Sequence, residues 1–74
     1  MVNRSASEWF ILAHSWYQVK EFGWQQAAQH SLNKIACYKS LPAEQRPPCM
    51  TYSSWFVIEE EIRLIAGGVT DAGS

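Results

Sequence analysis

Residues 5–23 read SASEWFILAHSWYQVKEFG, and this stretch decides the fold because it contains a helix start, a long apolar segment and a helix break. Ser5 followed by Glu8 fits a capping box, in which each side chain accepts a hydrogen bond from the backbone N–H of the other residue. The apolar side chains that follow recur at the spacing of one helical stripe: Trp9, Leu12, Trp16 and Val19. The stretch therefore predicts a helix over about residues 6–22.

Gly23 predicts where this helix ends. A glycine directly after Phe22 can take the left-handed conformation of a Schellman motif, which would bring Trp24 against Val19. Two observations favour continuity instead: no Ser, Thr, Asp or Asn caps a helix near Trp24, and a glycine inside a helix costs only about 1 kcal/mol relative to alanine. We expect a helical hairpin with a break or sharp bend at Gly23, and one long bent helix is the alternative.

Two more helices are expected, at about residues 25–39 and 54–66. A proline-containing loop over residues 41–52 joins them, because Pro47 and Pro48 cannot continue a helix. We interpret this loop as a plain connector. Helical spacing predicts the inward positions of the two helices: Ala28, Leu32, Ile35 and Tyr38 in one, and Trp55, Ile58, Ile62 and Ile65 in the other.

The length of the chain limits it to one domain. Of its 74 residues 47% are hydrophobic, which is too many for a disordered chain. We expect an all-α domain of three helices over residues 5–67, with disordered ends at residues 1–4 and 68–74. A chain of this length buries roughly 60% of its unfolded surface, and such marginal domains often recruit a second subunit.

Charge and hydropathy bear on the partners and the compartment. The chain has six basic and seven acidic residues, and the basic ones are scattered, without the positive cluster that duplex nucleic acid or an anionic membrane requires. The longest apolar run, residues 9–13, is far shorter than the roughly 20 residues of a membrane span or the roughly 7 to 15 of a secretion signal. We expect neither duplex nucleic acid nor membrane as a partner, and a cytoplasmic protein with reduced thiols.

Few residues are candidates for catalysis or metal binding. His30 and Cys37 share a helical face but lie roughly 10 Å apart, beyond hydrogen-bond reach. The Cys and His spacings do not match those of a zinc site. The acidic run 59–61 points in three directions and is interpreted as a solvated face, in which Glu59 forms an exposed ion pair with Arg63. We expect no catalytic residue, no metal and no cofactor.

The strongest functional signal is the aromatic content of the first helix. Residues 9–12 are all apolar, and consecutive helical residues point about 100° apart, so this helix is apolar on every side. Two other short helices cannot cover it fully, and soluble monomers rarely leave a large aromatic patch in water. We therefore predict a partner and dimer interface made by Trp9, Phe10, Leu12, Trp16, Tyr17 and Trp55. The alternative is that these aromatics fill the core of a monomer.

These observations lead to a functional hypothesis. The chain is expected to be a non-enzymatic regulatory module, an adaptor or inhibitor that forms a homodimer and binds a surface of a larger protein. Three alternatives stay open: a small dimeric regulator that binds nucleic acid, a subunit that folds only within a larger assembly, and a small enzyme that depends on a metal or a thiol.

Overall fold

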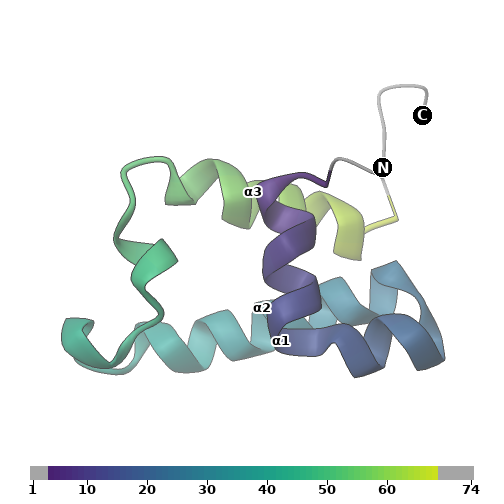
Figure 1. Ribbon diagram of the computed structural model, residues 1–74, viewed down its shortest axis with the longest axis horizontal. Coiled ribbons are helices and arrows are strands. Elements are labelled where there is room, and N and C mark those ends of the chain that lie inside the picture. Colours follow the sequence, from purple (N-terminus) through teal and green to yellow (C-terminus); the bar gives the residue numbers. More distant parts are fainter. Residues whose placement is uncertain (1–3, 69–74) are drawn as a thin grey trace.

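Three α-helices and two short 3-10 turns make up the fold, as the computed structural model of residues 4–68 shows (Figure 1). The elements are α1 (Ala6–Phe22), α2 (Trp24–Lys39), η1 (Ala43–Gln45), η2 (Pro48–Thr51) and α3 (Trp55–Ala66). No strand occurs among the described residues, so the expected all-helical, three-helix architecture is confirmed. The disorder expected for residues 1–3 and 69–74 lies outside the described part of the chain.

The start of α1 follows the capping signal in the sequence. Ser5 Oγ accepts a hydrogen bond from the backbone N–H of Glu8 at 3.2 Å, and Glu8 Oε1 accepts one from the backbone N–H of Ser5 at 3.0 Å. Both bonds satisfy N–H groups that have no partner within the helix, which is why α1 begins at Ala6.

A single residue, Gly23, connects α1 to α2. Its N–H donates to the carbonyl of Val19 at 3.0 Å, and its own carbonyl accepts from the N–H of Ala27 at 3.1 Å, so it ends one helix and starts the next. The expected break is therefore present, and the long bent helix is not. The prediction of a left-handed helical conformation at Gly23 is wrong. Gly23 combines φ 92° with ψ 175°, which is a different region and one that is almost exclusive to glycine.

The structure shows a kink inside α1 that was not expected from the sequence. Ser15 has φ −148° and ψ 29°, which interrupts the helical backbone. Figure 1 shows the consequence: the part of α1 before Ser15 crosses toward α3, whereas the part after it runs beside α2. Ser15 Oγ lies 3.0 Å from His30 Nδ1 and 2.9 Å from Ser31 Oγ, and these bonds from α2 hold the kinked residue in place.

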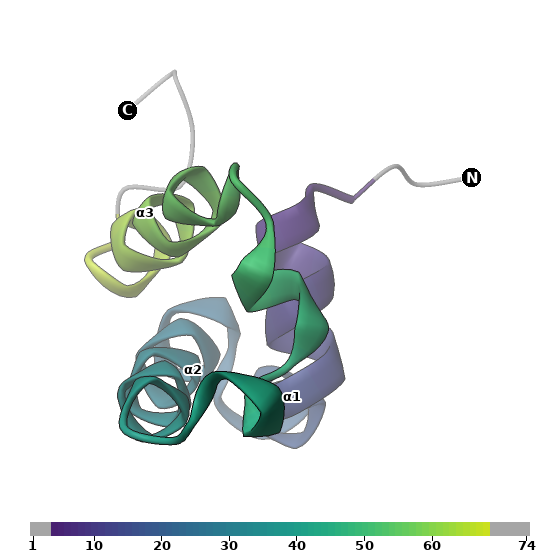
Figure 2. The same ribbon diagram turned by 90° about the vertical axis from the view of Figure 1, so that its left-hand side faces the viewer.

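The core lies where the three helices meet, and small residues dominate the contact between α1 and α2. The buried apolar side chains are Phe10, Ile11, Ala27, Ala28, Ile35, Trp55 and Ile62. In α1 the buried stripe is Ile11 flanked by Ser7 and Ser15, not the stripe of larger residues that contains Trp9 and Trp16. Alanine and serine side chains allow α1 and α2 to approach closely, and Figure 2 shows α1 beside α2, with α3 above α2.

Candidate interaction surface

An apolar groove of about 420 Å³ lies between the first half of α1 and the segment formed by η2 and the start of α3. Its floor contains Phe10 and Trp55, which are only 5% and 8% exposed and whose rings meet edge to face at 5.2 Å. Trp9 and Tyr52 stand at its sides and are each more than half exposed. The full lining is Ala6, Trp9, Phe10, Ala13, His14, Cys49, Tyr52, Ser54, Trp55 and Ile58.

Two features of the sequence position the walls of this groove. The kink at Ser15 directs the first half of α1 toward α3, where Ser7 Oγ donates a 2.6 Å hydrogen bond to Glu61 Oε1. The proline-containing loop supplies the other wall, because η2 begins at Pro48 and brings Cys49 and Tyr52 to face α1. The loop therefore also contributes to the lining of the groove.

The lining of the groove carries no Asp, Glu, Lys or Arg side chain. His14 stacks on Phe10 with ring centroids 4.1 Å apart, and its Nδ1–H donates to the Phe10 carbonyl at 3.0 Å, since a carbonyl can only accept. Burial raises the pKa of the Cys49 thiol above its ordinary value, although a backbone hydrogen bond partly offsets this effect, so Cys49 is a neutral thiol near pH 7. The chemistry of the lining thus suits an uncharged group.

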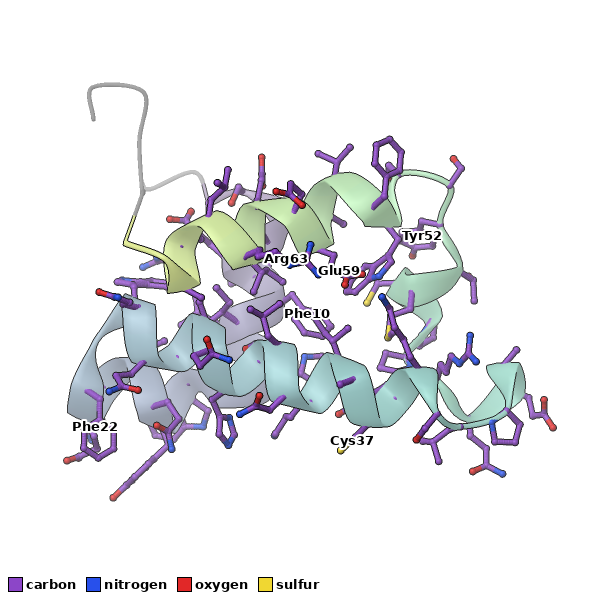
Figure 3. All side chains as sticks on the ribbon, turned by 180° about the vertical axis from the view of Figure 1, so that it is seen from behind. Phe10, Phe22, Cys37, Tyr52, Glu59 and Arg63 are labelled. Carbon is purple, nitrogen blue, oxygen red and sulfur yellow. The ribbon has the colours of Figure 1, made fainter. Side chains whose placement is uncertain are left out.

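The six residues predicted for the interface separate into four groups. Phe10 and Trp55 lie in the core and reach the groove as its floor (Phe10 is labelled in Figure 3). Leu12 is half-buried and does not line the groove. Trp9 borders the groove, whereas Trp16 and Tyr17 lie beyond the kink.

Trp16 and Tyr17 form a second exposed feature, which we call the aromatic pair. Their side chains are 57% and 58% exposed, and their rings meet nearly perpendicular at 6.3 Å. The Nζ of Lys20 lies 5.7 Å from the centre of the Trp16 ring, a cation–π arrangement. The aromatic pair therefore presents apolar rings with one positive charge beside them.

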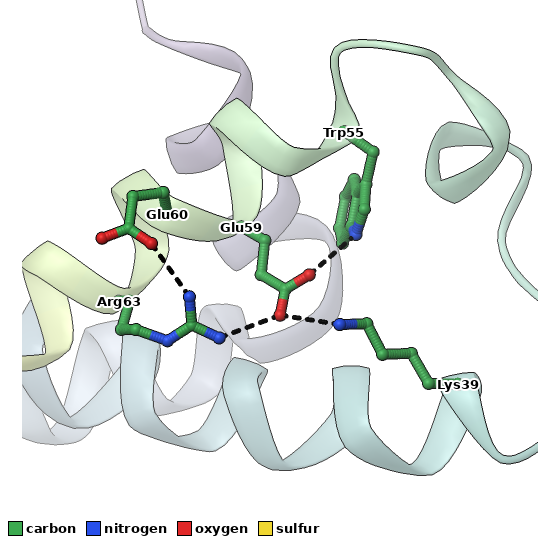
Figure 4. Close-up of polar contacts among 5 residues, drawn as sticks. All are labelled: Lys39, Trp55, Glu59, Glu60 and Arg63. Atoms are coloured by element: carbon green, nitrogen blue, oxygen red, sulfur yellow. Dashed lines mark hydrogen bonds and ion pairs between the residues drawn. The ribbon is translucent and has the colours of Figure 1, made fainter.

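A charged cluster supports the floor of the groove from the side of α2 (Figure 4). Glu59 Oε2 pairs with Lys39 Nζ at 2.9 Å and with Arg63 at 3.0 Å. Glu59 Oε1 accepts a 3.1 Å hydrogen bond from Trp55 Nε1, which fixes the indole ring. The expected pair between Glu59 and Arg63 is confirmed, but its solvated setting is wrong, because the Glu59 side chain is only 12% exposed.

The pKa of Glu59 is set by opposing effects. Burial alone would raise this pKa, but the hydrogen bonds and charges of Lys39 and Arg63 outweigh burial and hold it below its ordinary value. A cavity of about 350 Å³ adjoins the cluster, lined by Leu32, Ile35, Ala36, Lys39, Glu59 and Arg63. These charges already pair with one another, and the cluster joins α2 to α3.

Other features of the described residues bear on catalysis, metal binding and membrane insertion. Ser15 and His30 lie within hydrogen-bond distance, but Ser15 is 4% exposed and lines neither cavity, so no substrate can reach its hydroxyl. Within residues 4–68, no three His, Cys, Asp or Glu side chains are placed to hold a metal ion. None of the helices in this part of the chain is both long enough and apolar enough to cross a bilayer.

Sequence reasoning missed Cys49 and Tyr52, which line the groove from the loop, and also His14. No local signal identifies them, because the loop and α1 are far apart in the sequence. Comparisons with protein-family models, curated proteins and solved structures found no match to this chain. The groove and the aromatic pair are therefore the observations from which a function is inferred.

Proposed function

We propose that the chain is a non-enzymatic regulatory module, an adaptor or inhibitor, whose groove binds an uncharged apolar side chain of another polypeptide. The observation that carries this proposal is the groove of about 420 Å³, with a buried aromatic floor and the half-exposed Trp9 and Tyr52 at its sides. Trp and Tyr are enriched among the residues that dominate binding energy at protein interfaces.

The chemistry of the lining defines the occupant. A charged group entering the groove would lose its hydration without meeting an opposite charge among the lining residues, which costs several kcal/mol. An aromatic or aliphatic side chain instead gains about 25 cal/mol for each Å² of apolar surface that it removes from water. The groove therefore favours an apolar anchor.

The basic side chains supply a reason not to propose nucleic-acid binding. Lys39 and Arg63 are paired with Glu59, and Lys34 Nζ donates to the His14 carbonyl at 2.6 Å. Arg46 donates to the carbonyls of Leu41 and Lys39. A phosphate backbone would have to compete with these internal partners, which weakens the alternative of a nucleic-acid-binding regulator.

A second candidate function, a subunit of a larger assembly, is favoured by the outward face of α3. Phe56 is 72% exposed there, and Val57 and Leu64 are each nearly half exposed. None of these side chains lines the groove, so an assembly that covers them would use a different surface from the one proposed for a regulatory partner.

Site-specific photo-crosslinking in cells that produce the protein tests both candidates. A photoreactive amino acid replaces Tyr52 at the groove or Phe56 on α3, and Glu44, an exposed residue of η1, gives the background. The regulatory proposal expects a defined protein adduct from position 52. Adducts from position 56 alone would favour the assembly subunit and contradict the groove proposal.

A charge placed in the groove provides the matched control for this experiment. Ala13→Arg adds a bulky cation to the lining and should abolish the adduct from position 52. Gln26→Arg adds the same charge at an exposed position of α2 and should leave the adduct unchanged. Equal adduct yields from both variants would show that the partner does not use the groove.

A further inference from the structure

The aromatic pair on the same chain has a chemistry that matches the groove. Trp16 and Tyr17 are more than half exposed, and no partner within residues 4–68 covers their outer faces. Lys20 lies one turn after Trp16 with its ammonium over the indole ring. The aromatic pair therefore offers a ring that can enter an apolar groove, while the charged Lys20 beside it must stay at the edge of that groove.

A carboxylate lies beside the lining of the groove. Glu61 follows the lining residue Ile58 by one helical turn, and its Oε1 accepts a hydrogen bond from Ser7, the neighbour of the lining residue Ala6. Glu61 is exposed and pairs with no Lys or Arg among the described residues, although Glu59 and Glu60 of the same helix do. The groove thus has an apolar floor, and the Glu61 carboxylate, without a Lys or Arg partner among the described residues, lies beside its lining.

We propose that a second copy of this chain occupies the groove, with its Trp16 ring between Trp9 and Tyr52 and its Lys20 beside Glu61. This inference rests on the proposed function for the groove being a binding site, and it names the partner. The charge complementarity of Lys20 and Glu61 favours the second copy, because the basic residue and the aromatic anchor already lie next to each other on the exposed side of α1.

One contact of this kind buries too little surface for a stable dimer, so the contact must be made twice. A stable interface buries about 800 Å² on each partner, whereas two half-exposed aromatic rings offer roughly 200 to 300 Å². Because each copy carries both an aromatic pair and a groove, a two-fold arrangement uses both features of both chains and approaches the required area. A closed dimer follows, since an isologous contact leaves neither feature free.

Sedimentation equilibrium over a concentration series tests this dimer with the purified chain. Wild type should be dimeric, and Trp16→Ala should raise the dissociation constant at least about tenfold, as expected for an interface anchor. Lys20→Glu and Glu61→Lys should each raise it about five- to tenfold. Glu60→Lys, which changes a carboxylate on the outward face of α3, is the matched control and should leave it unchanged.

Restoration by charge exchange distinguishes the proposed contact from general weakening. The double variant Lys20→Glu/Glu61→Lys recreates the pair with reversed signs and should return to within about twofold of wild type. Since Glu61→Lys also removes an acceptor from Ser7, Glu61→Gln serves as a second variant that keeps an acceptor oxygen but loses the charge. Circular dichroism confirms that every variant is folded at the concentrations used.

The outcomes separate this inference from the proposed function. A wild type that stays monomeric, a Trp16→Ala variant that dimerises like wild type, or a double variant that fails to recover each overturns the self-pairing. Growth beyond a dimer overturns the closed arrangement. If any of these occurs while position 52 still crosslinks to another protein, the groove function stands and its occupant is not a second copy.

Discussion

Glu59 illustrates at the scale of a single residue how a charge can be buried at low cost. Its carboxylate meets Lys39, Arg63 and the indole N–H of Trp55, so each oxygen has a donor. Charge-assisted bonds of this kind are roughly twice as strong as neutral ones. The residue consequently ties α3 to α2 and also orients the floor of the groove.

Replacing Glu59 tests this role. We expect Glu59→Gln to lower the free energy of unfolding by about 1 to 2 kcal/mol, because the amide keeps an acceptor for Trp55 but loses two ion pairs. Urea denaturation measures the change. Glu60→Gln, which removes only an exposed pair with Arg63, is the control and should change stability by less than about 0.5 kcal/mol.

The lowered pKa of Glu59 predicts the acid limb of the stability profile. A carboxyl whose folded pKa lies below its unfolded value of about 4.3 stabilises the fold above that value, and this contribution is lost as the pH falls through the folded pKa. Denaturation midpoints measured from pH 6 to pH 2 should show a loss below about pH 4 that is smaller in Glu59→Gln. Identical acid limbs in both proteins would contradict the assignment.

Gly23 permits a sharp conformational test. Its φ of 92° and ψ of 175° are almost inaccessible to other residues, while a Cβ there would meet no atom within 4 Å. We expect Gly23→Ala to lower the free energy of unfolding by about 1 to 3 kcal/mol through backbone strain alone. Gly67→Ala is the control, because Gly67 has φ −81° and room for a Cβ, and it should be neutral or slightly stabilising.

At the scale of the elements, the kink separates α1 into two halves with different surroundings. Ser15 interrupts α1, and its hydroxyl is held by His30 and Ser31 of α2. All residues of α1 that line the groove precede the kink, so the groove and the aromatic pair lie on different halves of one helix.

Ser15→Ala tests the bonds that hold this kink. The substitution leaves the buried Ser31 hydroxyl without its Ser15 partner and removes the contact with His30, which should cost about 1 to 3 kcal/mol. Ser53→Ala, at an exposed position before α3, should be neutral. Thermal melts of the two variants distinguish them, and a Ser15→Ala variant as stable as wild type would show that the kink does not depend on these bonds.

How much of each element could be predicted depends on whether its cause is local. The expected ranges for the three helices differ from the observed ones by at most one residue at each end, because the capping box at Ser5, the break at Gly23 and the prolines act on neighbouring residues. The kink depends on His30 and Ser31, which lie 15 and 16 residues further along, and a serine at Ser15 gives no such signal by itself.

The candidate site was predicted less completely for the same reason. The aromatic content of α1 indicated an interaction surface, and the structure places Trp9, Trp16 and Tyr17 in water. Sequence spacing could not decide which aromatics face inward, since α1 is apolar on several sides. The walls from η2 depend on how the loop packs against α1, which no local pattern encodes.

At the scale of the whole molecule, the core and the exposed aromatics should respond differently to substitution. Ile35 is 2% exposed, so Ile35→Asp buries an unpaired charge and should unfold the chain. Tyr17 is 58% exposed, so Tyr17→Ala should retain the wild-type melting temperature at concentrations where the chain is monomeric. Unfolding by both substitutions, monitored by circular dichroism, would show that Tyr17 belongs to the core.

The distribution of the four tryptophans gives the molecule an optical readout of its own. A collisional fluorescence quencher such as acrylamide reaches the exposed Trp9 and Trp16, whereas Trp55 is buried with its N–H bound to Glu59. If quenching declines as the protein concentration rises, association is covering the exposed rings of Trp9 and Trp16. A new quenchable fraction from Trp55 instead reports opening of the fold, so one unlabelled sample can distinguish association from unfolding.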